Sequence, residues 1–178
     1  AQAAPTSPPP MTRIDFIITP DRLGCSRKQA GGSMQVDWRG VFPAATTQFA
    51  PDLSIDLSET QRVQDALVRD GVHGLIIMGT VGENNSLEPD EKQDVLRAAV
   101  EAVDKRVPVL VGVSEFDTKR AIAFARDAEK FGADGLMLLP AMVYVPTEAE
   151  LVAHFKAVAK ETALPIMLYN NPPAYRVS

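Results

Sequence analysis

The strongest constraint on the fold is an alternation of short apolar runs with longer amphipathic segments, which begins near Trp38 and continues to the end of the chain. Each run is almost continuously apolar and is bounded by Gly, Pro or Asn. That pattern is typical of strands buried on both faces of a parallel sheet. We therefore expect five strands, at residues 41–47, 74–79, 107–113, 135–139 and 165–169.

The segments between the runs carry helix start signals and apolar stripes at helical spacing. Ser58 and Thr147 each begin a capping-box pattern, and Thr118 is placed to cap a third helix. Pro89 suits the first turn of a fourth helix, where a backbone N–H would lack an intrahelical partner in any case. The sequence thus predicts four helices that alternate with the strands.

A repeat supports this reading, because residues 71–78 (GVHGLIIM) resemble residues 132–139 (GADGLMLL) at an offset of 132 − 71 = 61 residues. Such an offset corresponds to two βα units of about 30 residues each. Repeated βα units fit either a closed barrel or an open doubly wound sheet. The pattern by itself leaves both architectures open.

Composition sets residues 1–35 apart. Residues 1–10 contain four prolines, and residues 11–33 show no sustained periodicity. A segment of this kind buries little apolar area, so we expect a disordered leader. It lies upstream of the natural start if translation begins at Met34, and the alternative is a genuine N-terminal extension.

Charge and residue counts exclude several classes of protein. The formal net charge is −5 with acidic and basic residues interspersed, which predicts no nucleic-acid partner and no binding to an anionic membrane surface. No apolar stretch reaches the roughly 18 residues that span a bilayer. The single cysteine, Cys25, fits a reducing cytoplasm, and His73 and His154 lie too far apart to indicate a zinc site.

The residues that follow each run are the candidates for chemistry, because ligands meet the carboxyl ends of parallel strands. The second run leads into Gly79–Asn84, a two-glycine turn whose backbone N–H groups can hold a carboxylate or a phosphate. By itself this turn also fits a simple change of chain direction. The fourth run leads toward Tyr144, and the fifth ends in Tyr169.

Other polar residues receive structural interpretations. Ser114 and Glu115 are expected in an ordinary loop, and His154 at a polar position of the last helix. The lysines of the helices and the turns after them are expected to be solvated. They are Lys92, Lys105, Lys119, Lys130, Lys156 and Lys160.

Two of the turns carry family signatures. Gly79-Thr80-Val81-Gly82-Glu83 resembles the Gly-Thr-Thr-Gly-Glu signature of the dihydrodipicolinate synthase and N-acetylneuraminate lyase family. Tyr169-Asn170-Asn171-Pro172 resembles its Tyr-Asn-x-Pro signature, and residues 39–43 and 132–135 also fit. The resemblance implies that residues 36–178 form a partial TIM (β/α)8 barrel, an α/β fold with the first five strands and four helices, truncated before the sixth strand.

The resemblance also implies roles. The family binds a pyruvate-type 2-oxo acid as a Schiff base to a lysine at the end of the sixth strand, so this chain would contain no Schiff-base lysine. Val81 and Gly82 would bind the substrate carboxylate. Thr80 would hydrogen-bond Tyr169, and Tyr169 would act as general acid and base. Tyr144 is a further catalytic candidate, with a plain loop aromatic as the alternative.

Departures from the family pattern bear on the substrate. Val81 replaces the second threonine, Pro140-Ala141-Met142 stands where the synthases have proline followed by tyrosines, and Ala174 stands where they have arginine. These changes favour a relative that acts on another 2-oxo acid, such as a sugar-acid aldolase, a dehydratase or a hydroxyproline-pathway deaminase.

The resemblance thus implies that the full-length protein is a carbon–carbon or carbon–oxygen lyase, and we expect this segment to be inactive by itself. The resemblance implies no metal, no organic cofactor, a small 2-oxo acid as partner, a cytoplasmic location and homo-oligomers such as a homotetramer. Two rivals remain: a truncated, non-catalytic ligand-binding domain, and an open-sheet nucleotide-binding domain. The second is disfavoured because no phosphate-loop lysine or dinucleotide fingerprint follows the first strand.

Overall fold

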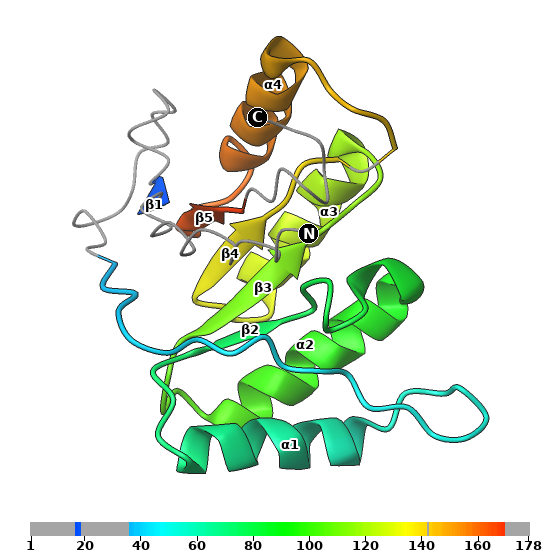
Figure 1. Cartoon of the computed structure of the whole chain (residues 1–178), viewed down its shortest axis with the longest axis vertical. Coiled ribbons are helices and arrows are strands. Elements are labelled where there is room, and N and C mark those ends of the chain that lie inside the picture. The colour runs from blue at the N-terminus through cyan, green and yellow to red at the C-terminus, as the bar shows by residue number, and fades with distance from the viewer. Residues whose placement is uncertain (1–16, 19–35, 142, 170–178) are drawn as a thin grey trace, which may run out of the picture.

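The computed structural model describes residues 17–18, 36–141 and 143–169. Helices and strands alternate through most of the chain (Figure 1). The elements are β1 Ile17–Ile18, α1 Leu57–Arg69, β2 Leu75–Ile77, the 3-10 helix η2 Asn84–Ser86, α2 Pro89–Val103, β3 Val109–Val113, α3 Thr118–Lys130, β4 Gly135–Leu138, α4 Glu148–Ala159 and β5 Ile166–Leu168.

The sheet has the order β1-β5-β4-β3-β2, and its strands β2 to β5 are parallel and adjacent in sequence order. Each of these strands pairs with the next one along the chain, after a helix that returns the chain to the amino end of the sheet. This is the arrangement of consecutive units in a (β/α)8 barrel. The predicted α/β fold, part of a TIM barrel with four helices, is confirmed.

The first predicted strand is shorter than expected. Of residues 41–47, only Ala44 forms a bridge, parallel to Ile76 of β2. The Ala45 N–H donates to the Ile76 carbonyl at 2.8 Å, and the Ile76 N–H donates to the Pro43 carbonyl at 3.0 Å. Pro43 has no N–H to donate, which limits the ladder. The segment nevertheless lies where the first barrel strand was predicted, beside β2.

β1 was not expected, because Ile17–Ile18 fall within the range predicted to be a disordered leader. They pair antiparallel with β5, at Met167 and Ile166 respectively. An edge strand offers unpaired N–H and C=O groups to any extended segment nearby, which accounts for the pairing. The rest of residues 1–35 lies outside the described residues.

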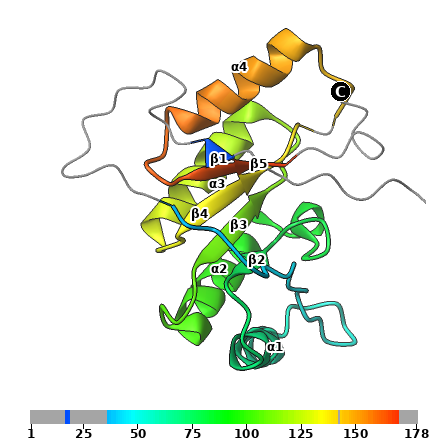
Figure 2. The ribbon, with the colours of Figure 1, turned by 60° about the vertical axis from the view of Figure 1, so that its left-hand side comes forward.

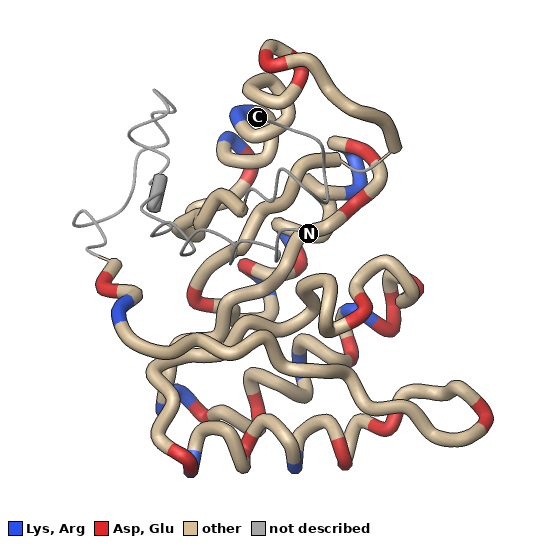
Figure 3. The backbone as a smooth tube through the Cα atoms, in the orientation of Figure 1, with Lys and Arg blue, Asp and Glu red and all other residues tan. Residues whose placement is uncertain are grey.

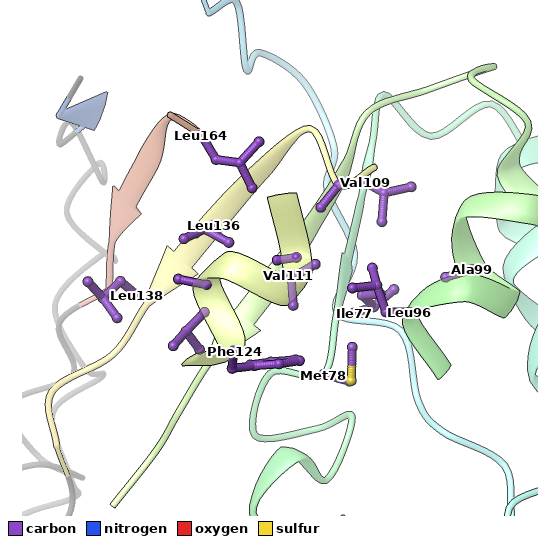
Figure 4. Packing of buried hydrophobic residues seen from close by; sticks show 14 of the residues in the cluster. Ile77, Met78, Leu96, Ala99, Val109, Val111, Phe124, Leu136, Leu138 and Leu164 are labelled. Carbon is purple, nitrogen blue, oxygen red and sulfur yellow. The ribbon is translucent and has the colours of Figure 1, made fainter. Parts of the chain in front are cut away.

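The hydrophobic core lies between the sheet and the helices (Figure 4). Alternate strand residues such as Ile77, Val111 and Leu136 meet helix residues such as Leu96 and Phe124. Full burial of each such side chain stabilises the fold by about 1.5–3 kcal/mol. In Figure 2 the helices follow the order of the strands they connect, and α1 packs beside α2 and α3 beside α4. The carboxyl ends of β2 to β5 therefore share one edge.

Two of the predicted helix caps are wrong by one or two residues. The side chain of Asp56, not Ser58, accepts the Glu59 N–H at the start of α1, at 2.9 Å. The side chain of Asp117, not Thr118, accepts the Arg120 N–H at the start of α3. In both places an aspartate just upstream reaches the free N–H groups, and carboxylates are good caps there.

The other two helix starts are confirmed. Pro89 is the first residue of α2, which also has a capping box formed by Glu88 and Glu91. Thr147 and Glu150 form the predicted capping box of α4. Figure 3 shows acidic and basic residues interspersed along the described helices. Within the described ranges, no helix has the length and apolar composition needed to cross a bilayer.

His154 was predicted to be merely a polar position on the last helix, but it is buried between α4 and α3. Its Nδ1 lies 3.0 Å from Thr118 Oγ1 at the start of α3. Burial lowers the pKa of the imidazole, an effect opposed by a hydrogen bond to the Leu139 backbone and by the charge of Asp117. The ring thus joins both helices to the end of β4.

Candidate active site

The turn after β2 is the most sharply constrained part of the carboxyl edge. Met78, which precedes the signature, and Glu83, its last residue, have φ angles of 51° and 58°. Residues other than glycine seldom adopt this left-handed region, and at functional sites such strain is held in place by surrounding contacts. The tight turn brings the backbone of residues 79–82 to the open end of the strand.

Glycine is required at two positions around this turn. A Cβ at Gly82 would lie 2.7 Å from the Met78 nitrogen and 3.0 Å from the Ala45 carbonyl oxygen. A Cβ at Gly112, in the neighbouring β3, would lie 2.3 Å from the Met78 carbonyl oxygen. The turn is therefore packed backbone to backbone against both adjacent strands.

Side-chain hydrogen bonds fix the same turn from either side. The hydroxyl of Thr47, in the first strand segment, donates to the Gly82 carbonyl at 2.8 Å in a buried position. The amide of Asn84 donates to the Gly112 carbonyl of β3 at 3.0 Å. The turn is thus anchored before any ligand arrives, which lowers the entropic cost of binding one.

The predicted carboxylate site lies at the exposed side of this turn. Thr80 is exposed, and Val81 is 54% exposed although it is apolar. The Val81 and Gly82 N–H groups have no backbone acceptor among the described residues. Consecutive N–H groups in a turn are common donors to a bound anion. Val81 is exposed and Gly82 is buried, and the binding of a carboxylate by their N–H groups stays a prediction.

Tyr169 directly follows β5 and is partly buried. Its N–H donates to the Leu138 carbonyl at 2.9 Å, which extends the pairing with β4 by one residue. Tyr169 and Thr80 therefore stand at the same edge of the sheet, with β3 and β4 between their strands. Their mutual hydrogen bond stays a prediction. The rest of the second signature, from Asn170, lies outside the described residues.

Tyr144 has a partner of its own. It is 62% exposed in the loop before α4, and its hydroxyl donates to Glu150 Oε1 at 3.3 Å. Glu150 belongs to the capping box, and the Thr147 backbone N–H is the main reason that its pKa is lowered. The structure thus brings Tyr144 to the start of α4, and its catalytic role stays a prediction.

Lys92 corrects the prediction that all the helix lysines are solvated, because it is only 6% exposed. Its Nζ lies 2.5 Å from Glu115 Oε1, and 5.5 Å from the centre of the Phe124 ring. Glu115, predicted to lie in an ordinary loop, is equally buried. The signal that would have revealed Lys92 is its spacing, since it continues the apolar stripe of Val95, Leu96 and Ala99.

The charged pair borders a cavity of about 270 Å³ between α2 and α3. Phe116 and Phe124 supply its apolar walls, and Arg120 and Asp127 supply further charges. The remaining described lysines, at 105, 119, 130, 156 and 160, are exposed as predicted. The described residues contain no group of three or more His, Cys, Asp or Glu placed to hold a metal ion.

Residues 37–176 match the model of the dihydrodipicolinate synthetase family. A 4-hydroxy-tetrahydrodipicolinate synthase of Chelativorans sp. (strain BNC1) is 41% identical over 136 residues, which are 76% of this chain and 46% of the relative. An uncharacterized DapA-like lyase of Rhizobium meliloti is 38% identical over 141 residues, 79% of this chain and 47% of the relative.

Solved structures show the same likeness. YagE from Escherichia coli K12, a prophage protein of the dihydrodipicolinic acid synthase family in complex with pyruvate, superposes with a TM-score of 0.76 at 33% identity. The match covers 79% of this chain and 47% of YagE. The chain therefore spans about half the length of the relatives that it matches.

Proposed function

Because the chain belongs to the dihydrodipicolinate synthetase family, we propose that the whole protein is a Schiff-base lyase acting on pyruvate or a related 2-oxo acid. The observation that carries this proposal is the anchored turn at residues 78–83. This turn lies at the carboxyl edge of a barrel sheet, and its Val81 and Gly82 N–H groups have no backbone acceptor among the described residues. YagE, which shares the fold, has been solved with pyruvate bound.

In the proposed reaction the turn binds the substrate carboxylate and so places the 2-oxo carbon beside an amine. A lysine elsewhere in the whole protein attacks that carbon, and loss of water gives the Schiff base. Tyr169 donates and accepts the protons that these steps require, with Thr80 orienting its hydroxyl. The positive charge of the protonated Schiff base then stabilises the carbanion formed when a bond next to it is made or broken.

The second substrate separates the activities within this proposal. The relatives named above favour 4-hydroxy-tetrahydrodipicolinate synthesis. Val81 in the signature and Ala141 after β4 favour instead a dehydratase, a sugar-acid aldolase or a hydroxyproline-pathway deaminase. We place the enzyme in the cytoplasm, as a homo-oligomer that needs no metal or organic cofactor.

A non-catalytic binding domain is the alternative from a different class. It shares the anchored turn but does not require a reactive lysine. The two functions differ in whether a covalent adduct forms, so trapping with borohydride distinguishes them.

The test is to incubate the whole protein with pyruvate, reduce it with borohydride, and measure its intact mass. We expect one pyruvyl adduct per chain on a lysine outside these 178 residues. Reversible pyruvate binding without an adduct would support the binding domain instead.

A second measurement tests the tyrosines in the whole protein. Tyr169→Phe should lower turnover by about 10²–10⁴-fold, the usual contribution of general acid–base catalysis, with little change in pyruvate affinity. Tyr144→Phe serves as the comparison, and its smaller loss is expected because that hydroxyl contacts Glu150. Unchanged turnover in Tyr169→Phe would remove this residue from the mechanism.

A further inference from the structure

Two asparagines follow the signature turn in the 3-10 helix η2, and their side chains make contacts of different kinds. Asn84 is fully buried and uses only its amide N–H, toward Gly112, since its Oδ1 has no partner among the described residues. Asn85 uses both ends of its side chain. Its Nδ2 donates to the Ser114 carbonyl at 2.7 Å, and its Oδ1 accepts the Ser114 hydroxyl at 3.1 Å.

This reciprocal pair joins the far end of the turn to the residue that directly follows β3. Ser114 comes directly after the last residue of β3 and is buried, so the surrounding packing fixes its position. Thr47 holds Gly82 from the opposite strand. The turn is therefore held by hydrogen bonds from the strand segments on both sides. Among the residues that hold it, Thr47 and Asn84 are buried and Asn85 is exposed.

The strained backbone of the turn makes these hydrogen bonds necessary. Met78 and Glu83, at φ angles of 51° and 58°, each adopt a conformation that a non-glycine residue leaves when it is released. Relaxation of Glu83 would rotate the peptide units that precede it. Those units carry the N–H groups of Val81 and Gly82, which the proposed function assigns to the substrate carboxylate.

We propose that Asn85, through its two hydrogen bonds with Ser114, is a positioning residue for the carboxylate-binding turn. It touches no substrate and moves no proton. It sets the direction of the turn N–H groups, and its removal therefore weakens the grip on a carboxylate more than it affects the reacting carbonyl. This inference rests on the proposed function, because it assumes that the turn receives a 2-oxo acid.

The test compares two probes in the whole protein. Pyruvate carries the carboxylate, whereas methyl pyruvate presents the same carbonyl without it. The concentration that gives half-maximal borohydride trapping is measured for each probe, in the wild type and in Asn85→Ala. We expect about a tenfold weaker response to pyruvate, the size of effect that loss of one or two part-buried hydrogen bonds usually has. The response to methyl pyruvate should change less than about twofold, because no carboxylate contact is lost.

Further variants keep the test decisive. Ser114→Ala removes the hydroxyl that donates to Asn85 Oδ1 and leaves the Ser114 backbone carbonyl in place. It should therefore show the same preference with a smaller loss, and it replaces Asn85→Ala if that variant fails to fold. The double variant should lose no more than Asn85→Ala alone, since both changes break one link. Ser86→Ala is the matched control. It lies in the same 3-10 helix, and its exposed hydroxyl has no hydrogen bond within the described residues.

The outcomes separate this inference from the function on which it rests. Equal losses for the two probes, or no loss in Asn85→Ala, would overturn the positioning role while the lyase stands. A wild-type protein that forms no adduct with pyruvate would overturn the proposed function, and the inference with it.

Discussion

The side chains of Lys92 and Glu115 form a buried ion pair, although Lys92 was predicted to be solvated and Glu115 to lie in an ordinary loop. Both side chains are 8% exposed, and they meet between α2 and the end of β3. A buried charge is costly unless it is paired, so each of these residues depends on the other. The pair fixes α2 against the strand that also carries Gly112 and Ser114, and so supports the turn indirectly.

Breaking this pair should be strongly destabilising. We predict that Lys92→Met lowers the free energy of unfolding by about 3–5 kcal/mol, because Glu115 is left buried and unpaired. Thermal unfolding of the whole protein provides the measurement. The double change Lys92→Met with Glu115→Leu should recover much of the loss, since both charges are then absent.

Lys119→Met is the matched control, because that lysine is exposed on α3 and its removal should cost within about 0.5 kcal/mol. If Lys92→Met were as stable as the control, the ion pair would contribute nothing to the fold.

At the scale of elements, helices α3 and α4 are joined through His154, whose Nδ1 meets Thr118. The contact places a titratable ring in the seam between two helices and the end of β4. Because burial lowers the pKa of this ring, the folded state favours its neutral form. Protonation of the imidazole should therefore weaken the packing of α4 against α3.

This seam should make stability depend on pH. The unfolded chain binds the proton first as the pH falls through the ordinary value of 6.5, so the stabilisation is complete above that pH and is lost below it. We predict that the unfolding temperature falls between about pH 6.5 and pH 5, and that His154→Gln flattens this part of the profile.

The carboxylates with lowered pKa values, such as Glu59 and Asp65, lose their contribution only at lower pH and should not obscure the result. An unchanged slope in His154→Gln would assign the pH dependence to other groups.

At the scale of the whole molecule, the described sheet is an arc with two ends. Ala44 stands at one end, beside β2, and β5 stands near the other, where β1 pairs with two of its residues. Strand edges with unpaired N–H and C=O groups favour association with other chains. The matched part of this chain covers 46% of a relative, and a complete barrel leaves no edge.

The 178-residue chain by itself should therefore be inactive and poorly stable. The described lysines other than Lys92 are exposed on helices or turns, away from the signature turn, and the Nζ of Lys92 is held by Glu115. We predict no adduct when the purified chain is treated with pyruvate and borohydride and its mass is measured. We also expect aggregation or partial folding. A stoichiometric adduct on one of its lysines would show that the nucleophile has been misplaced.

The fold class and the positions of the candidate site residues can be predicted from the amino-acid sequence. The runs that form β2 to β5 are apolar throughout because both of their faces are covered, and such continuous apolar runs can be recognised in the sequence. Pro89 and the Thr147 capping box are local signals of the same kind, since a helix start is decided within a few residues. The signature turn is also recognisable in the sequence, and one of its glycines, Gly82, is required because a Cβ there would meet the Met78 and Ala45 backbone.

The burial of particular polar residues, in contrast, depends on contacts between distant parts of the chain. Lys92 and Glu115 are 23 residues apart, and His154 and Thr118 are 36 apart, so no local pattern connects either pair. Asn85 and Ser114 likewise meet only because β2 and β3 are neighbours in the sheet. Burial of a polar group depends on a partner brought from elsewhere in the chain, and that partner is set by strand order and helix packing rather than by sequence periodicity.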